Sequence, residues 1–173
     1  TANMEDVVVR GISLDRNQAK ITVDDVRDEA GIAGQIFSAI AHGNIGVDMI
    51  VQSVSKHGMT DISFTIHDKD LESAKRLLAP VIKEVQAAGL LTTGGMAKLS
   101  VVGIGMRSHS GVAARLFDCL GKAGINIQLI STSEIKIAVL INGKDADRAA
   151  QLTHQEFGLA TVVAPAARDS DEE

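Results

Sequence analysis

The segment AGIAGQIF, at residues 30–37, returns as SGVAARLF at residues 110–117. The similarity continues, because NIGVDMI at 44–50 is matched by GINIQLI at 124–130. Both matches have an offset of 80 residues, from Gly31 to Gly111 and from Val47 to Ile127. A repeat of this length exceeds the roughly 20–50 residues of a solenoid unit. The sequence therefore predicts two copies of one small domain.

The hydrophobic pattern of each copy is interpreted as βαββαβ. Apolar residues recur at helical spacing over 31–41, 70–88, 111–122 and 145–157, and β-branched or alternating runs predict the strands between them. This order is typical of the α+β, ferredoxin-like arrangement, an antiparallel sheet with both helices on one face. The bare face of such a sheet needs a partner, which a second copy would supply.

The two copies are placed at 18–94 and 95–164, with other segments outside them. Residues 4–17 are an extra strand, strongest at 7–12, followed by a turn at 15–18, and either sheet could receive that strand. Pro80 is expected to kink or restart the helix at 70–88. Residues 165–173 are predicted to be a disordered acidic tail.

The composition is that of a globular chain without nucleic-acid or membrane features. The 173 residues carry a net charge of −5 and only 2% aromatic side chains. We therefore expect no nucleic-acid partner and no attraction to an anionic membrane. No apolar run reaches the roughly 18 residues of a membrane span. Cys119 is the only cysteine, so a cytoplasmic location without disulfides is expected.

The familiar catalytic and metal-binding patterns are missing. There is no glycine-rich phosphate loop with a lysine and no HExxH, and the five histidines are scattered. Ser108, His109 and Ser110 look like a nucleophile and base, but adjacent loop side chains rarely meet, so Ser110 is interpreted as a helix cap. Cys119 lies on an apolar helical stripe, which favours a packed thiol. We expect no catalytic residue, no metal and no cofactor.

Two loop-to-helix junctions are more promising for ligand binding. They are DEAGIA at 28–33, with Asp28 placed as the helix cap, and SHSGVA at 108–113. A helix start has free backbone N–H groups that bind anions such as an amino-acid carboxylate, and small residues let a ligand approach. Gly31 and Gly111 would equally suit tight packing of helix against sheet, and the residues alone favour neither interpretation.

The repeat units resemble ACT domains, the ligand-sensing modules of amino-acid metabolism. Over residues 4–163 the chain also resembles the C-terminal regulatory half of bacterial aspartokinase. The matching segments are MEDVVVRGI at 4–12, VDMIVQ at 47–52, TDISF at 60–64 and LISTSEI at 129–135. Within them, STSEI at 131–135 is the most specific.

The resemblance implies a regulatory chain rather than an enzyme. It implies feedback inhibition of aspartate phosphorylation by threonine, lysine or both, in lysine, threonine and methionine biosynthesis. The implied partners are a second copy, bound through the ACT domains, and the aspartokinase catalytic α subunit or kinase domain. That kinase domain, with its KFGG motif, is absent from this sequence. A separate β subunit starting at Met4 and an excised regulatory half both remain open.

In the family, the effector lies between the first ACT domain of one chain and the second ACT domain of another. Carried over by position, the helix-start loop of the first domain would meet the charged head of the amino acid through Asp28, Ala30, Gly31 and Ala33. Asp48 and Gln52 would add polar contacts from the next strand. A neutral amide such as Gln52 suits the hydroxyl of threonine, whereas a lysine effector would need an acidic group such as Asp48 or Glu134.

The partner's second domain is implied to close the site. Its residues, again carried over by position, are Asn126, Ile127 and Gln128. Three more belong to the motif around which effector contacts concentrate in the family: Thr132, Ser133 and Glu134. The equivalent loop at 106–112 is a candidate second site, although it is two residues longer than its counterpart.

Two other functions are less consistent with the sequence. The first is an ACT-type regulatory subunit of another biosynthetic enzyme, such as acetolactate synthase, against which the STSE run argues. The second is an acylphosphatase-like hydrolase on a ferredoxin-like fold, which would need an Arg in a phosphate-cradling loop together with an Asn. Arg107 is the only candidate for that arginine, and the rest of its loop lacks the pattern.

Overall fold

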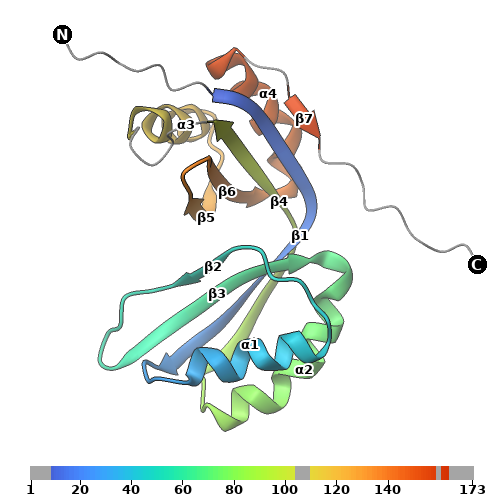
Figure 1. Ribbon diagram of the computed structural model, residues 1–173, viewed down its shortest axis with the longest axis vertical. Coiled ribbons are helices and arrows are strands. Elements are labelled where there is room, and N and C mark those ends of the chain that lie inside the picture. The colour runs from blue at the N-terminus through green and yellow to red at the C-terminus, as the bar shows by residue number, and fades with distance from the viewer. Residues whose placement is uncertain (1–8, 104–109, 159–160, 164–173) are drawn as a thin grey trace, which may run out of the picture. The chain divides into compact units, whose positions relative to one another are not determined.

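The computed structural model describes residues 9–103, 110–158 and 161–163. Two hydrophobic clusters divide the chain into two units (Figure 1). Asn17–Met96 form what we call the continuous unit. Thr1–Arg16 and Ala97–Glu173 form the split unit, whose sequence is interrupted by the continuous unit.

The continuous unit is a four-stranded antiparallel sheet with two helices on one face (Figure 1). Its strands lie in the order β2-β3-β1-β4. In chain order the elements are the second part of β1 (Val9–Arg27), α1 (Ile32–His42), β2 (Ile50–Gln52), β3 (Met59–His67), the 3-10 turn η1 (Asp68–Asp70), α2 (Leu71–Glu84) and the first part of β4 (Gly89–Gly103).

The core of this unit lies between the sheet and the helices. On β3, the alternate residues Ile62, Phe64 and Ile66 point toward the helices and are buried. On α1, Ile32, Ile36 and Ile40 recur at helical spacing and meet them. Phe64 is fully buried, and its ring meets that of Phe37 edge to face, with centroids 5.1 Å apart.

The split unit repeats this plan around a second core. Its strands lie in the order β7-β1-β4-β6-β5, with β5 and β6 antiparallel and β7 parallel to β1. The elements not yet named are α3 (Ser110–Lys122), β5 (Ile127–Thr132), β6 (Lys136–Asn142), the 3-10 turn η3 (Gly143–Asp145), α4 (Ala146–Phe157) and β7 (Thr161–Val163). The predicted pair of ferredoxin-like βαββαβ units is confirmed.

The sequence repeat is also a repeat of burial. The buried positions of α1 and the segment after it recur 80 residues later, as Ile32 and Val112, Ile36 and Leu116, Ile40 and Leu120, Ile45 and Ile125, and Met49 and Leu129. The helix ends match as well, because the amides of Ile45 and Ile125 donate to the carbonyls of Ile40 and Leu120. Each copy therefore packs the same face of its first helix.

The predicted turn at 15–18 is wrong, since β1 runs unbroken through it. Asn17 has a φ of +59°, a left-handed conformation that Asn tolerates better than most residues. Before this residue, Ile12–Leu14 pair with β7; beyond it, Gln18 begins the pairing with β3. The polar run marks the passage of one strand from the split unit to the continuous unit. The N-terminal strand lies between β7 and β4, within the sheet of the split unit.

Three smaller expectations also change. Helix α2 continues through Pro80 without a restart. The β-branched run at 47–54 is typical of one extended strand, but only Ile50–Gln52 form a strand there. The sequence also favours a separate strand from residue 20 and a charged loop over 24–30, but β1 passes through both of these starts and ends at Arg27. The loop 104–109, the cap at Ser110 and the tail 164–173 lie outside what the structure describes.

None of the described helices is long and apolar enough to cross a membrane.

Two buried threonines allow a stability prediction, because only one has a hydrogen-bond partner among the described residues. The Thr153 hydroxyl on α4 is buried without a partner, whereas Thr65 Oγ1 accepts from Met49 N–H at 3.0 Å. Thr153→Val is expected to raise the free energy of unfolding by about 1 kcal/mol, because a stranded hydroxyl is removed. Urea denaturation measures this, with Thr65→Val as the control expected to lose stability. A lower midpoint for Thr153→Val would contradict it.

Candidate functional site

Helix α1 begins in a way that leaves its backbone open to a ligand. Gly31, the residue before the helix, has φ +92°, a conformation strained for any residue with a Cβ. Its carbonyl accepts from Gln35 N–H at 3.1 Å and starts the helix. No side chain caps α1. Apart from the Ile32 amide, which donates to the Glu29 carbonyl at 3.4 Å, the first-turn N–H groups have no acceptor among the described residues and are available to a ligand.

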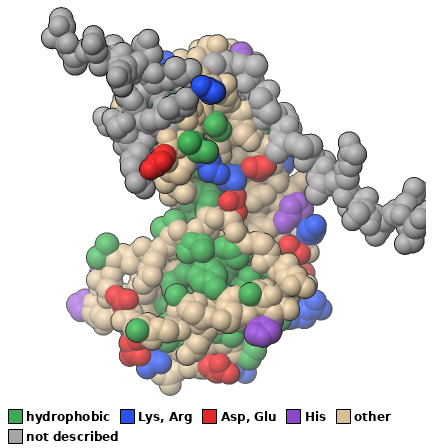
Figure 2. Space-filling view, in the orientation of Figure 1, with side chains coloured by type: hydrophobic (Ala, Val, Ile, Leu, Met, Phe, Trp, Pro, Cys, Tyr) green, Lys and Arg blue, Asp and Glu red, His purple; other side chains and the backbone are tan. Residues whose placement is uncertain are grey.

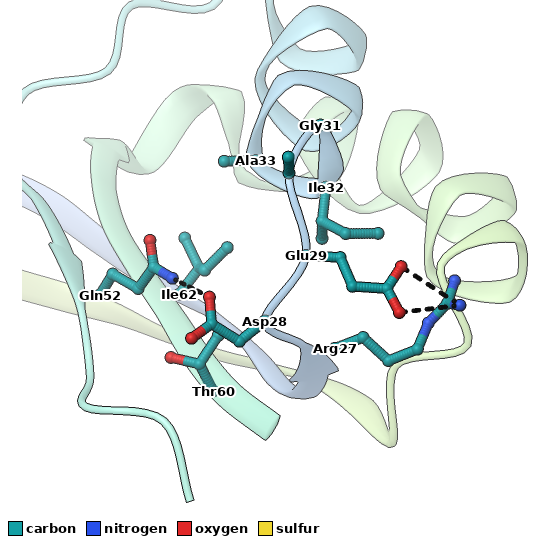
Figure 3. A pocket seen from close by; sticks show the side chains of 10 residues that line it. Arg27, Asp28, Glu29, Gly31, Ile32, Ala33, Gln52, Thr60 and Ile62 are labelled. Carbon is teal, nitrogen blue, oxygen red and sulfur yellow. Dashed lines mark hydrogen bonds and ion pairs between the residues drawn. The ribbon is translucent and has the colours of Figure 1, made fainter. Parts of the chain in front are cut away.

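A cavity of about 260 Å³ opens at this helix start (Figure 3). It is bounded by the end of β1, the loop that follows, the first turn of α1, and side chains from β2 and β3. Its size is at the small end for a ligand site, which suits a molecule as small as a free amino acid. The lining residues are Arg27, Asp28, Glu29, Ala30, Gly31, Ile32, Ala33, Gln52, Thr60 and Ile62.

The polar groups of the cavity lie on two sides (Figure 3). On one side, Gln52 Nε2 donates to Asp28 Oδ1 at 3.4 Å. On the other, Arg27 Nη1 lies 3.5 Å from both carboxylate oxygens of Glu29. Arg27 Nε is buried and has no hydrogen-bond partner among the described residues. The helix amides, the carboxylates and the guanidinium provide acceptors and donors for both ends of a zwitterion.

The predicted site residues of the first copy gather at this cavity with one exception. Asp28, Ala30, Gly31, Ala33 and Gln52 all line it. Asp48 does not, and its backbone N–H donates to Thr65 O at 3.0 Å. The helix cap predicted at Asp28 is wrong, because α1 begins at Ile32 and its N-cap position is Gly31. The Asp28 carboxylate instead accepts from Gln52 Nε2 at 3.4 Å.

The predicted site residues of the second copy belong to the split unit. Asn126 and Gln128 are exposed, and Ile127, the first residue of β5, is half-buried. Thr132 ends β5, and Glu134 lies exposed in the turn to β6. Ser133 shapes that turn.

Ser133 has structural contacts of its own. Its hydroxyl accepts from Lys136 N–H at 3.2 Å and from Ile135 N–H at 3.4 Å, and its amide donates to Lys136 O at 2.8 Å. A serine hydroxyl that holds its own turn is an ST turn. Part of the STSEI motif therefore closes the β5–β6 hairpin.

Five lining residues had no individual role in the sequence-based prediction: Arg27, Glu29, Ile32, Thr60 and Ile62. Of these, Glu29 and Ile32 lie in the junction at 28–33 that was expected to bind a ligand. Arg27 and Glu29 flank Asp28, and their position was the available signal. Thr60 and Ile62 could not be found in that way, because they enter through the pairing of β3 with β1, in which Ile62 is opposite Val23 and Thr60 is opposite Val26. The register of β3 against β1 cannot be read from the local sequence.

The bulge between these pairs carries three carboxyl groups. Asp24 and Asp25 lie on β1, and Asp25 N–H donates to Asp61 Oδ1 at 2.8 Å. A side-chain hydrogen bond to Asp61 raises the pKa of Asp24, and partial burial and the charges of Asp61 and Asp25 act in the same direction. The folded chain therefore binds this proton more tightly than the unfolded chain does.

This raised pKa predicts a pH dependence. The stabilisation from Asp24 is present below the ordinary pKa of 3.8 and is lost as the pH rises through the higher folded value. Asp24→Asn is expected to remove that loss, so the variant gains stability over the parent as the pH rises. Denaturation midpoints from acid to neutral pH measure this, with Glu84→Gln, at an exposed glutamate on α2, as the control. A constant difference at all pH values would contradict the assignment.

The other groups considered for catalysis or metal binding have a structural role or lie outside the described residues. Cys119 on α3 is half-buried, and burial raises the pKa of its thiol, which disfavours the reactive thiolate. Among the described residues, no group of three or more His, Cys, Asp or Glu side chains could hold a metal ion. The segment around Arg107, considered above for hydrolysis, is outside the described residues.

The ACT domain family model matches residues 21–80 and 99–157, one match in each unit. The chain is 45% identical over 157 residues to an aspartate kinase of Pseudomonas fluorescens (strain SBW25), covering 91% of this chain and 38% of that protein. It is 46% identical over 156 residues to an aspartokinase of Helicobacter pylori (strain ATCC 700392 / 26695), covering 90% and 38% respectively. It thus spans 38% of the length of these curated relatives.

Two solved structures cover nearly the whole described chain. One is the crystal structure of aspartokinase alpha and beta subunits, with 45% identity and a TM-score of 0.82, covering 88% of this chain and 100% of that one. The other is the ligand-free regulatory subunit of aspartate kinase from Thermus thermophilus, with 35% identity and a TM-score of 0.81, covering 86% and 98%.

Two matched βαββαβ units define the class, and the chain belongs to the ACT domain family as a tandem pair of the aspartokinase regulatory type. More particularly, it corresponds to the regulatory part of an aspartokinase and has an allosteric regulatory role. The relatives named here are aspartokinases, and none of them supports the alternative with acetolactate synthase.

Proposed function

We propose that this chain is the non-catalytic, amino-acid-sensing part of an aspartokinase. It binds threonine, lysine or both, and the bound effector feedback-inhibits the phosphorylation of aspartate. The observation that carries this proposal is the cavity at the start of α1, where open helix amides, Asp28 and Gln52 meet in one small space.

The chemistry of that cavity suits the constant part of an amino acid. The carboxylate of the effector binds the amides of the first turn of α1, where the helix dipole favours negative charge. Its ammonium group binds the carboxylate of Asp28 in a charge-assisted hydrogen bond. Gln52 offers both a donor and an acceptor to the effector's side chain, as a hydroxyl requires.

A second copy of the chain is proposed to complete the site. Within the described part of the chain, β2 and β5 are edge strands of their own units, so each has backbone groups without a neighbouring strand there. They carry exposed isoleucines at matching positions of the repeat, Ile50 at 56% and Ile130 at 44%. Figure 2 shows hydrophobic side chains gathered on the side of the continuous unit where Figure 1 draws β2, β3 and α1. Pairing between copies covers these surfaces.

The partner copy then contributes Asn126, Ile127 and Gln128 to the effector. Thr132, Ser133 and Glu134 follow on the same hairpin and set its shape and charge. Effector binding across two chains favours one arrangement of the dimer over another, with a coupling free energy of roughly 1–3 kcal/mol per site. The catalytic subunit or kinase domain of the aspartokinase responds to that arrangement.

Isothermal titration of the purified chain with L-threonine and, separately, with L-lysine tests this proposal. Saturable binding of at least one of them, together with capture of an aspartokinase catalytic subunit, is the expected result. A dimer in sedimentation that tightens with the same amino acid supports the shared site. Absence of binding by both amino acids, in the chain alone and with the catalytic subunit present, would overturn it.

A further inference from the structure

The cavity carries more charged groups than the binding of an amino acid's constant part uses. Two carboxylates, Asp28 and Glu29, and one guanidinium, Arg27, line it. Asp28 lies on the side of Gln52, whereas Arg27 and Glu29 pair with each other on the opposite side (Figure 3). The lining therefore carries one more negative than positive charge.

The pair of Arg27 and Glu29 contributes little to folding. Both side chains are about half exposed, at 42% and 56%, and the closest approach of their charged atoms is 3.5 Å. An exposed pair with this geometry contributes between nothing and about 1 kcal/mol to stability, and salt screens it. A role in choosing the ligand is therefore a better explanation of this pair than a role in stability.

An unpaired Arg27 would attract anionic ligands. A guanidinium is built to bind a carboxylate through two parallel hydrogen bonds, and Arg27 keeps a buried Nε without a partner among the described residues. Glu29 neutralises this group from within the cavity lining. A second carboxylate on a ligand would meet Glu29 and Asp28 instead of a free cation.

We propose that Glu29, by pairing with Arg27, makes this cavity reject amino acids with an anionic side chain, aspartate above all. The inference rests on the proposed function and concerns the selectivity of the same site. An aspartate kinase works in the presence of aspartate, so a feedback site that accepted the substrate would report the wrong metabolite. Exclusion by like charge is a repulsive element of specificity, which acts beside the attractive contacts to the effector.

The test compares L-aspartate with L-asparagine, which have almost the same shape and differ in charge. Each competes against whichever of threonine and lysine binds the parent chain, and a binding titration gives the competition constants. The variants are Glu29→Gln, the double variant with Arg27→Gln, and Glu84→Gln. Glu84 is an exposed glutamate at the end of α2, outside the cavity, and is the matched control.

In the parent and in Glu84→Gln, asparagine is expected to compete at a concentration at least about tenfold lower than aspartate. Glu29→Gln should tighten aspartate by about tenfold relative to asparagine, the change expected from roughly 1.4 kcal/mol of electrostatic discrimination. The double variant should lose that gain, because Arg27 provides it.

Two results would overturn the inference while leaving the proposed function intact. One is threonine or lysine binding in the parent chain with aspartate competing as well as asparagine. The other is a Glu29→Gln variant that still binds the effector but gains no affinity for aspartate. Failure of both effectors to bind the parent chain would instead refute the proposed function, on which the inference depends.

Discussion

Replacing Asp28 by alanine is expected to weaken effector binding by about 10- to 100-fold, the value of a charge-assisted hydrogen bond. Asp28 is exposed on the loop before α1, where its carboxylate is placed to receive the ammonium group of the effector. Among the described residues, its side chain accepts a 3.4 Å hydrogen bond from Gln52 Nε2. Removing so long a contact changes the free energy of unfolding little, so the loss should appear in affinity alone. Isothermal titration measures it.

Asp48→Ala is the matched control for this variant. Asp48 is also an exposed aspartate of the continuous unit, but it does not line the cavity. The resemblance to aspartokinase gives both residues a part in effector binding, whereas the geometry of a single chain gives the larger part to Asp28. Equal losses in the two variants would contradict that division. An unchanged affinity in Asp28→Ala would show that the Asp28 carboxylate does not bind the effector.

Phe64→Ala is expected to produce the largest loss of stability, about 3–5 kcal/mol. The Phe64 side chain is fully buried in the core of the continuous unit, and it meets Phe37 edge to face. Truncation removes the transfer free energy of the ring and leaves a cavity between the sheet and the helices. Against the 5–15 kcal/mol that holds most domains folded, this loss brings the continuous unit close to unfolding. Urea denaturation measures the total.

Hydrogen exchange shows where the Phe64→Ala loss falls. Because each unit has its own cluster of buried residues, exchange should rise in α1, α2 and β3 while α3 and α4 keep most of their protection. Leu116→Ala, a fully buried residue of the other cluster, should give the opposite pattern. A uniform rise throughout the described chain in both variants would mean that the two cores unfold as one.

The repeat made most of the fold predictable. Glycine and apolar residues at a constant offset predicted two copies, and helical spacing in each copy predicted the buried face of its first helix, from Ile32 to Ile40 and from Val112 to Leu120. These predictions depend on local patterns that the sequence carries directly.

The path of β1 was not predictable in the same way. A polar run at 15–18 is typical of a turn, but Ile12–Leu14 pair with β7, whose residues come almost 150 positions later in the chain. Long-range strand pairing outweighed the local preference and kept the strand extended on both sides of Asn17. The predicted cap at Asp28 failed for another reason, because α1 begins later, at Ile32, after Gly31 in a left-handed conformation.

The residues of the candidate site that lie in one local segment were predictable. Those that strand pairing brings to the cavity were not. The loop from Asp28 to Ala33 was visible because glycine and small residues precede a helix. Thr60 and Ile62 reach the cavity from β3, and only the pairing of β3 with β1 places them there. The charges of Arg27 and Glu29 can be read from the sequence, but the pair had no predicted role. A role follows only from the cavity that both residues line.

The most direct measurement is a nuclear magnetic resonance titration of the ¹⁵N-labelled chain with L-threonine and with L-lysine. If the cavity at the start of α1 is the effector site, the amides of Gly31 and Ala33 and the side-chain amide of Gln52 will shift in a saturable way with at least one of them. Saturable shifts confined to other residues, with these three signals unmoved, would contradict the assignment of the site.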